Sequence, residues 1–282
     1  MLSYLDRKNS RKKKLSAAIC IAIEAVIVIF IYFKFYYMII SSVKANSDIL
    51  ANPFLITQGL HFENYVTAFQ KVMKYLGNSF IITGGVVAGV LFVGTASAYI
   101  FARFQFPFKN ALFLFILAFM MIPDTMTLIP SFVLVTKLKL VNTFWAVILP
   151  TVTMGQIMYI LVIRAFIEGI PNDLFDAGKI DGVSNLGAFI HIVFPLAKPM
   201  FISMLLMTFL TSWNDFIWPL LTLTKESLKT VTLGLYSFSD AQQIRYGEMF
   251  AGFVLASIPP ILLFGFNMKH FITGLTSGAI KA

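Results

Sequence analysis

The chain alternates between long apolar runs and shorter polar segments along its whole length. An apolar run of about 18 residues or more predicts a membrane-spanning helix rather than a core helix. Such runs occur at residues 15–43, 77–102, 110–132, 142–163, 199–223 and 247–268. At about 20 residues per span, these helices and their connections use most of the 282 residues. The predicted fold class is therefore all-α and integral to the membrane, with six transmembrane helices.

The polar segments divide the chain into regions. The expected organisation is a basic tail at 1–14, a first transmembrane helix at 15–43, a loop on the far side of the membrane at 44–76, a core of five helices at 77–270 and a second tail at 271–282. In the core, Gly85 and Gly89 have the GxxxG spacing that permits close helix contact. Pro123, Pro130 and Pro150 fall inside expected spans, where freed backbone groups are tolerated only beside protein or a cavity. We expect these spans to lie inside a bundle.

Composition excludes an ordinary water-soluble enzyme. Only 12% of the residues are charged and 58% are hydrophobic, whereas soluble domains carry about 25% charged residues. The formal net charge of +9 would suggest nucleic acid in a soluble protein, but here the topology of the membrane protein explains it better. The single cysteine, Cys20, excludes an internal disulfide.

The basic residues predict the orientation of the chain. Cytoplasmic flanks carry an excess of Lys and Arg, and the first flank usually dominates. Six basic residues precede the first apolar run: Arg7, Lys8, Arg11, Lys12, Lys13 and Lys14. Leaving out Lys34, the side with the two termini holds thirteen basic residues against eight, and without the first tail it holds seven against eight. The prediction that both termini are cytoplasmic therefore depends on that tail.

The sequence shows no motif for bond-making chemistry. It contains no GxxxxGK[ST] phosphate-binding loop and no HExxH motif, and His61, His191 and His270 lie far apart. We therefore expect no catalytic residue, no metal site and no cofactor on this chain. If the chain transports a solute, the energy must come from a partner or from an ion gradient.

The polar stretch at 164–198 contains the most informative pattern, a predicted short helix after residue 170. Pro171 and Asn172 are helix start signals, and Asp173 and Asp176 suit the positive end of a helix. Gly182 provides a stop, because glycine can take the left-handed conformation that ends a helix. The result is a helix of about nine residues, which is too short to cross a bilayer. A second short helix is expected from about Asn185 to Phe194, ending at Pro195.

The surface of this short helix favours a protein partner. Leu174, Phe175 and Ile180 provide apolar contacts, while the segment carries three aspartates and one lysine. A helix that lies on anionic lipid should be richer in Lys and Arg. A groove on another protein is therefore the expected binding surface.

The same stretch resembles the EAA motif of permease subunits in binding-protein-dependent ABC importers. That motif has a core of EAA, three residues and Gly, within a stretch that ends in PLxxP. The matching residues are Asp176-Ala177-Gly178, Asp181-Gly182 and Phe194-Pro195-Leu196-Ala197-Lys198-Pro199. The departures are Asp176 for Glu, Gly178 for the second Ala and Val183 for Ala.

Further segments are similar to the carbohydrate branch of this family, typified by the smaller permease subunit of the maltose importer. They occur in the expected order from about residue 60 to the end: Phe62-Glu63-Asn64-Tyr65, Asn78-Ser79, Ala98-Tyr99-Ile100-Phe101-Ala102-Arg103-Phe104, Met121-Ile122-Pro123, Leu149-Pro150, Ser212-Trp213-Asn214-Asp215 and Gly274-Leu275-Thr276-Ser277-Gly278-Ala279-Ile280-Lys281.

The resemblance implies a type I ABC importer permease in a bacterial plasma membrane, with both termini cytoplasmic. The loop at 164–198 would form a coupling helix that docks in a cleft on a cytoplasmic ATPase. Two copies of that ATPase would bind ATP and Mg, and a second, usually different, permease would complete the pathway. An extracytoplasmic binding protein would deliver a sugar or oligosaccharide. The coupling residues implied are Leu174, Phe175, Asp176, Ala177, Gly178, Asp181 and Gly182.

Candidates for the substrate pathway lie near the expected middle of spans. Trp213, Asn214 and Asp215 offer a ring for stacking and polar groups for hydrogen bonds, and an acid in a span is costly unless it faces the interior. Gln156 and Tyr159 are similar candidates. A structural role for each remains the alternative. The motifs do not identify the solute, so a permease for another polar solute such as glycerol phosphate stays open, as does a gradient-driven secondary carrier, for which we expect inverted repeats.

Overall fold

A computed structural model of the chain describes residues 2–55, 59–238 and 244–279. In these ranges every regular element is helical. Five helices are long and apolar enough to cross a membrane, and a bent pair raises the number to six if it counts as one span. The chain divides into two compact units, residues 1–69 with 238–255 and residues 70–237 with 256–282. Two long helices, α3 (Glu63–Arg103) and α12 (Tyr246–Ala279), contribute to both units.

The first unit contains the first expected span. Helix α1 (Leu2–Ser42) includes the apolar segment Ala17–Ser42, and α2 (Asn46–Ala51) follows after a short turn. Lys44 is buried in that turn, and its Nζ donates hydrogen bonds to the carbonyl oxygens of Asn52 and Pro53 at 3.0 and 3.3 Å. The buried ammonium is thus satisfied by backbone, as a buried charge requires.

The prediction of a loop at 44–76 is wrong for its second half, because α3 already begins at Glu63. Ala68, Val72 and Tyr75 are buried, and their spacing of four and three residues places them on one face of a helix. Polar residues separate these buried positions, so the segment has the pattern of an amphipathic helix, which a search for long apolar runs does not detect. This helix therefore runs for 41 residues, well beyond the apolar run that starts at Gly77.

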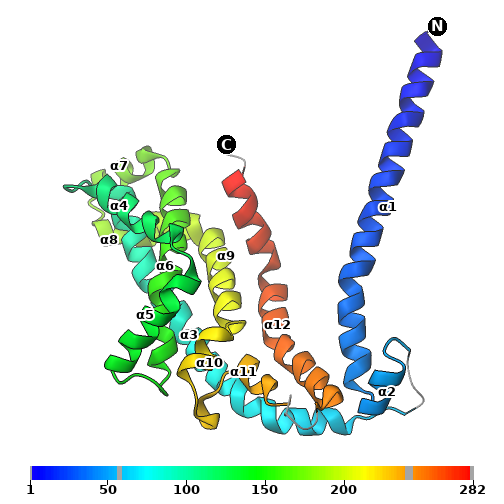
Figure 1. Cartoon of the computed structure of the whole chain (residues 1–282). Helices are drawn as coiled ribbons and strands as arrows, with labels where there is room; N and C mark the ends of the chain where they lie inside the picture. The colour runs from blue at the N-terminus through cyan, green and yellow to red at the C-terminus, as the bar shows by residue number, and fades with distance from the viewer. Residues whose placement is uncertain (1, 56–58, 239–243, 280–282) are drawn as a thin grey trace. The chain divides into compact units, whose positions relative to one another are not determined.

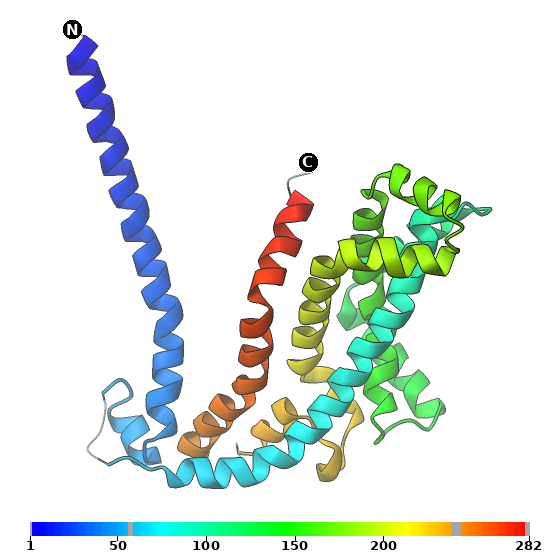
Figure 2. The ribbon, with the colours of Figure 1, turned by 180° about the vertical axis from the view of Figure 1, so that it is seen from behind.

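The second unit holds most of the remaining elements. They are α4 (Lys109–Ala118), η1 (Phe119–Met121), α5 (Asp124–Lys137), α6 (Trp145–Glu168), α7 (Asn172–Ile180), α8 (Asn185–Ala188), the π-helix η2 (Phe189–Val193), α9 (Phe194–Trp213), α10 (Ile217–Thr222), η3 (Glu226–Leu228) and α11 (Val231–Tyr236). Figure 1 shows α7 and α8 at one end of this unit and α10 and α11 at the other, with α3, α6 and α9 between them. The same arrangement is seen from behind in Figure 2.

Close packing of α3 against α6 builds the core of this unit. A Cβ atom added at Gly85 would lie 2.8 Å from Ile148 Cδ1, and one added at Gly89 would lie 2.7 Å from Val152 Cγ2. A side chain at either glycine would force its neighbour to shift, more severely at the branched Val152 than at the flexible end of Ile148, so both glycines permit this close approach. The GxxxG prediction is confirmed at this helix pair.

The third and fifth expected spans are broken. Helices α4–η1 and α5 meet at an angle of 100° beside Pro123, as expected, whereas Pro130 stays inside α5. The expected span at 199–223 ends at Trp213, and α10 begins four residues later. Asp215 therefore lies in the connection between two helices, and its expected place in the middle of a span is wrong.

The expected end of a short helix at Pro195 is also wrong. Residues Asn185–Trp213 form one continuous helical segment of 29 residues. The turn just before Pro195 is the π-helix η2, in which the ordinary ladder of hydrogen bonds is already disrupted. Pro195 follows this π-turn directly, so its missing N–H falls where the regular hydrogen-bond ladder is already interrupted.

The last helix is longer than the expected span at 247–268. Helix α12 passes through Pro259 and Pro260 and continues to Ala279, so most of the expected tail at 271–282 is helical. The side chains of the Gly274–Lys281 motif and of the basic tail at 1–14 lie outside the described part of the chain.

Candidate functional site

The short helix α7 has the predicted bounds and the predicted end. Gly182 has a φ of +73°. The N–H of Val183 donates to the carbonyl of Gly178 at 2.8 Å, and the N–H of Gly182 donates to that of Lys179 at 3.0 Å. This pair of hydrogen bonds is the Schellman motif, which satisfies carbonyls left free at a helix end. The predicted stop at Gly182 is confirmed.

One face of α7 packs on the protein and the other is open. Gly178 is buried, and a Cβ atom there would lie 3.3 Å from Ile192 Cδ1. Ile180 is 88% exposed and Leu174 45% exposed. Phe175 differs from the expectation of an outward apolar contact, because its half-buried ring lies against the guanidinium of Arg103. The open apolar contacts of α7 are therefore Leu174 and Ile180.

The remaining predicted coupling residues are polar or small and face outward. Asp176 and Lys179 form an ion pair at 2.9 Å, and both side chains are largely exposed. Ala177, Asp181 and Gly182 are exposed as well. An exposed ion pair of this kind contributes little to stability, so these residues are available to a partner without loss to the fold.

The last turns of α3 contact the loop on both sides of α7. Arg103 donates from Nη1 to Asn172 Oδ1 at 2.7 Å and from Nη2 to the carbonyl oxygen of Ile170 at 3.0 Å. Tyr99, one turn earlier, donates its hydroxyl to the carbonyl oxygen of Asn185 at 2.9 Å. Sequence analysis assigned neither side chain to this loop, although both belong to the Ala98–Phe104 motif.

The predicted pathway residues Trp213, Asn214 and Asp215 form the joint between α9 and α10. Trp213 is buried, and its ring stacks on Phe209 with the centroids 5.2 Å apart. Asn214 donates from Nδ2 to the carbonyl of Leu210 at 2.9 Å. Asp215, one residue before the N-cap Phe216, accepts from the N–H of Trp218 at 3.4 Å and so caps a free donor in the first turn of α10.

The other two pathway candidates lie on α6. Tyr159 is fully buried, and its hydroxyl lies 2.7 Å from Thr95 Oγ1. A Cβ atom at Gly94 would lie 2.5 Å from its ring, so Tyr159 fills the space that this glycine leaves. Gln156 is half-buried.

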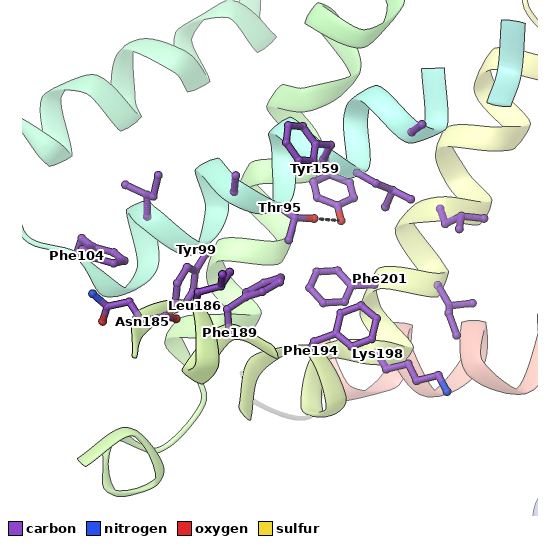
Figure 3. Close-up of a pocket in the computed structure, with 17 residues that line it drawn as sticks. Thr95, Tyr99, Phe104, Tyr159, Asn185, Leu186, Phe189, Phe194, Lys198 and Phe201 are labelled. Carbon is purple, nitrogen blue, oxygen red and sulfur yellow. Dashed lines mark hydrogen bonds between the residues drawn. The ribbon is translucent and has the colours of Figure 1, made fainter. Parts of the chain in front are cut away.

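Tyr159 also borders a cavity of about 810 Å³ between α3, α6 and the α8–α9 segment. Figure 3 shows the Thr95–Tyr159 hydrogen bond on one side of this cavity and Lys198 at its edge, beyond Phe194 and Phe201. Most of the side chains around it are aromatic or aliphatic. Trp213, Asn214 and Asp215 do not border this cavity, so it does not join the two sets of pathway candidates.

A polar joint in the first half of α3 was not predicted from the sequence either. Tyr75 donates its hydroxyl to Glu226, and Asn78 donates from Nδ2 to the carbonyls of Ser227 and Lys229, each at 2.9 Å. Ser79 accepts from the N–H of Val231 at 2.8 Å. The Asn78-Ser79 motif therefore fixes the segment 226–231 against α3.

These contacts give the second unit two polar centres along α3, one around Asn78 in its first half and one around Arg103 at its end. Among the described residues, no group of three or more His, Cys, Asp or Glu side chains is placed to hold a metal ion. The geometry provides an exposed short helix held on a rigid helix end, which suits a contact with another protein rather than catalysis.

Comparison with known proteins identifies the family. Residues 85–276 match the family model described as binding-protein-dependent transport system inner membrane component. The chain belongs to this family. The permease is 31% identical to the arabinooligosaccharides transport system permease protein AraQ of Bacillus subtilis, over 88% of this chain and 90% of AraQ. It is 33% identical to the glucose import system permease protein GlcU of Saccharolobus solfataricus, over 85% of this chain and 86% of GlcU.

Solved structures share the fold of the permease. A chain in the crystal structure of a bacterial ABC transporter involved in the import of the acidic polysaccharide alginate matches it with a TM-score of 0.79, at 18% identity, over 93% of this chain and 98% of that chain. A second structure, of the alginate transporter in complex with alginate pentasaccharide-bound periplasmic protein, matches with a TM-score of 0.70 at 14% identity, over 92% of this chain and 94% of that chain. The permease is therefore an all-α, multi-pass membrane protein with the fold of an ABC importer permease.

Proposed function

We propose that this permease forms half of a translocation pathway for a sugar or oligosaccharide, which an extracytoplasmic binding protein delivers. The observation that carries the proposal is similarity over nearly the whole chain to permeases named for arabinooligosaccharides and for glucose. A second, different permease would provide the other half. The family description, which names a binding-protein-dependent system, supports the delivery step.

The proposal places the energy source on another chain. A cytoplasmic ATPase, present in two copies, would bind ATP and Mg and dock on α7. The exposed Leu174 and Ile180 would enter its cleft, and Asp176, Ala177, Asp181 and Gly182 would shape the contact, while the buried Gly178 would let α7 pack closely on Ile192. Exposed apolar side chains on a helix that also carries exposed aspartates favour a protein surface over anionic lipid as the partner of α7.

Uptake in cells tests the class of substrate. Cells that lack the chromosomal gene for this chain, complemented with the gene or with an empty plasmid, would be given labelled glucose, lactose, arabinooligosaccharides and glycerol phosphate. We expect gene-dependent uptake of a carbohydrate. Gene-dependent uptake of glycerol phosphate alone would overturn the sugar proposal.

Energy coupling separates an ABC importer from a secondary carrier. We expect uptake to stop when cellular ATP is depleted while the ion gradient is kept, and to persist when the gradient is collapsed but ATP is kept. The reverse pattern would favour a gradient-driven carrier. The purified chain alone should show no ATP hydrolysis, and hydrolysis by that chain would contradict the assignment to a separate ATPase.

Cysteine labelling tests the proposed orientation, with α7 and both termini in the cytoplasm. The exposed native Cys20 is first replaced by serine. Ile180→Cys would then be compared with Lys225→Cys, which lies in the segment after α10 and is also exposed. A membrane-impermeant maleimide added to intact cells should label position 225 and leave position 180 unlabelled. Labelling of position 180 in intact cells would reverse the orientation.

A further inference from the structure

We propose that Arg103 is a positioning residue that, together with Tyr99, fixes α7 against the end of α3. The consequence for transport depends on the proposed function, because α7 matters for coupling only if an ATPase docks on it. The positioning itself does not depend on that function. It follows from contacts within the second unit.

Arg103 makes three separate contacts with the start of the α7 segment. Its two terminal nitrogens donate to Asn172 Oδ1 and to the carbonyl oxygen of Ile170, at 2.7 and 3.0 Å. Its Cζ atom lies 3.5 Å from the centroid of the Phe175 ring. Only a planar guanidinium can donate in two directions and stack on a ring at the same time. A lysine at this position would lose the geometry while keeping the charge.

Helix α7 needs an external support of this kind. An isolated helix of nine residues is unstable in water, because nucleation is costly and few hydrogen bonds repay it. Its N-cap position is Pro171, and no side chain caps its first turn. The guanidinium of Arg103 only donates and so cannot cap the free N–H groups, but its contact with Asn172 holds that end of α7 against α3.

Tyr99 provides the second point of support, after α7. Its hydroxyl donates to the carbonyl of Asn185 at 2.9 Å, and its ring lies 5.3 Å from that of Phe189. Tyr99 and Arg103 are four residues apart on α3 and so share one face of the helix. The two side chains thus hold the beginning and the end of the loop on one rigid element.

The guanidinium of Arg103 also has an unfavourable feature. Its Nε is buried and has no hydrogen-bond partner among the described residues. A buried donor without a partner is unfavourable for folding. A lysine, with its single amino group, would avoid that unfavourable donor. The presence of arginine at this position is therefore explained by the contacts of its two terminal nitrogens and by the stacking of its plane on Phe175.

Arg164 provides a matched control on the neighbouring helix α6. Its guanidinium also stacks on a phenylalanine, Phe113, at 3.7 Å, and forms an ion pair with Glu168 at 2.8 Å. It too has a buried nitrogen without a partner among the described residues. Neither of these contacts reaches α7. Replacement of either arginine by lysine removes a comparable set of interactions, but only one replacement removes contacts with α7.

The test measures the position of α7 in the assembled importer. In a Cys20→Ser background, spin labels at Asp173→Cys on α7 and Lys137→Cys on α5, both exposed positions, report one distance by pulsed electron paramagnetic resonance. We expect Arg103→Lys to replace the narrow distance distribution with a broad one, and Arg164→Lys to leave it narrow. Asn172→Ala, which keeps the arginine, should broaden the distribution less. A narrow distribution in both Arg103→Lys and Asn172→Ala, or equal broadening in Arg164→Lys, would overturn the positioning role.

Coupling is measured on the same samples and separates the two proposals. Sugar uptake per ATP hydrolysed should fall in Arg103→Lys by roughly tenfold, the effect expected for loss of a charge-assisted hydrogen bond, and should be retained in Arg164→Lys. Broadening of the α7 position with unchanged uptake per ATP would leave the positioning role intact and contradict the function proposed for α7. An unchanged position with lost coupling would contradict the positioning role alone.

Discussion

Gly182 shows how a single backbone angle sets the end of α7. Its φ of +73° is strained for a residue with a side chain, yet a Cβ atom there would meet nothing within 4 Å. We therefore expect Gly182→Ala to cost roughly 1–2 kcal/mol at the end of the helix through strain alone. ATPase co-purification and uptake should both fall. Asn tolerates the left-handed region better, so Gly182→Asn should retain more of both, and equal loss in the two variants would argue against backbone strain as the cause.

Two variants of Asp215 can distinguish whether this residue caps α10 or contributes to the substrate pathway. Its carboxylate accepts the N–H of Trp218, which an amide oxygen can do as well. If capping is its role, Asp215→Asn should keep uptake and thermal stability near those of the unmodified permease. Asp215→Ala should lower the stability by about 1 kcal/mol. Thermal unfolding and uptake on both variants check this, and loss of uptake in a stable, assembled Asp215→Asn complex would show that the charge itself is needed.

At the scale of the element, the segment 226–231 is fixed to α3 by a titratable contact. The ammonium of Lys229, and then the hydroxyl of Tyr75, hold the pKa of the Glu226 carboxyl below its ordinary value. Because the folded-state pKa is lowered, this contribution is complete at neutral pH and is lost as the pH falls through that lowered value. Hydrogen exchange at Leu228 and Val231 should therefore accelerate, relative to the intrinsic rate, only on acidification.

The matched variant for this segment is Glu226→Gln, which cannot form the ion pair with Lys229. We expect faster exchange in this variant already at neutral pH, without the acid-dependent step. The backbone N–H of Lys225 is the control, because it donates to Asn142 Oδ1 at 2.9 Å without involving Glu226. The exchange rate of the Lys225 amide should therefore be equal in the two proteins. An acid-dependent step that survives in Glu226→Gln would assign the effect to another group.

Elements whose signals are local were predicted well from sequence. Helix α7 begins after a proline and ends at a glycine, so both ends are encoded within the segment itself. The breaks at Asn214–Phe216 and the continuity through Pro195 depend on packing and on a π-turn, which hydropathy does not detect. The contacts of Arg103 with Ile170 and Asn172 join residues 67 and 69 positions apart. No pattern along a single sequence reports such a contact.

At the scale of the whole molecule, the predicted orientation depends on the first tail. Without its six basic residues, the count of Lys and Arg becomes seven against eight and no longer favours one side. We expect a variant with all six replaced by Gln to insert in both orientations. An alkaline phosphatase fused to the C-terminus, active only outside the cytoplasm, should be inactive with the natural tail and gain activity in the variant. In a control variant with Lys137 and Lys139 replaced by Gln, the fused phosphatase should remain inactive. Phosphatase activity in this control would contradict the rule that the basic residues of the first flank set the orientation.

The unbroken helical segment from Asn185 to Trp213 has a mechanical consequence. It starts where Tyr99 holds the loop after α7 and ends just before Asp215. The segment is not a straight rod, because Figure 2 shows its yellow-green first part turning a corner into its yellow second part. The π-turn of η2, followed by Pro195 and Pro199, interrupts the regular ladder of backbone hydrogen bonds in this part of the segment. We therefore expect the segment to act as a hinge between the loop after α7 and the joint at Asp215, and not as a rigid rod.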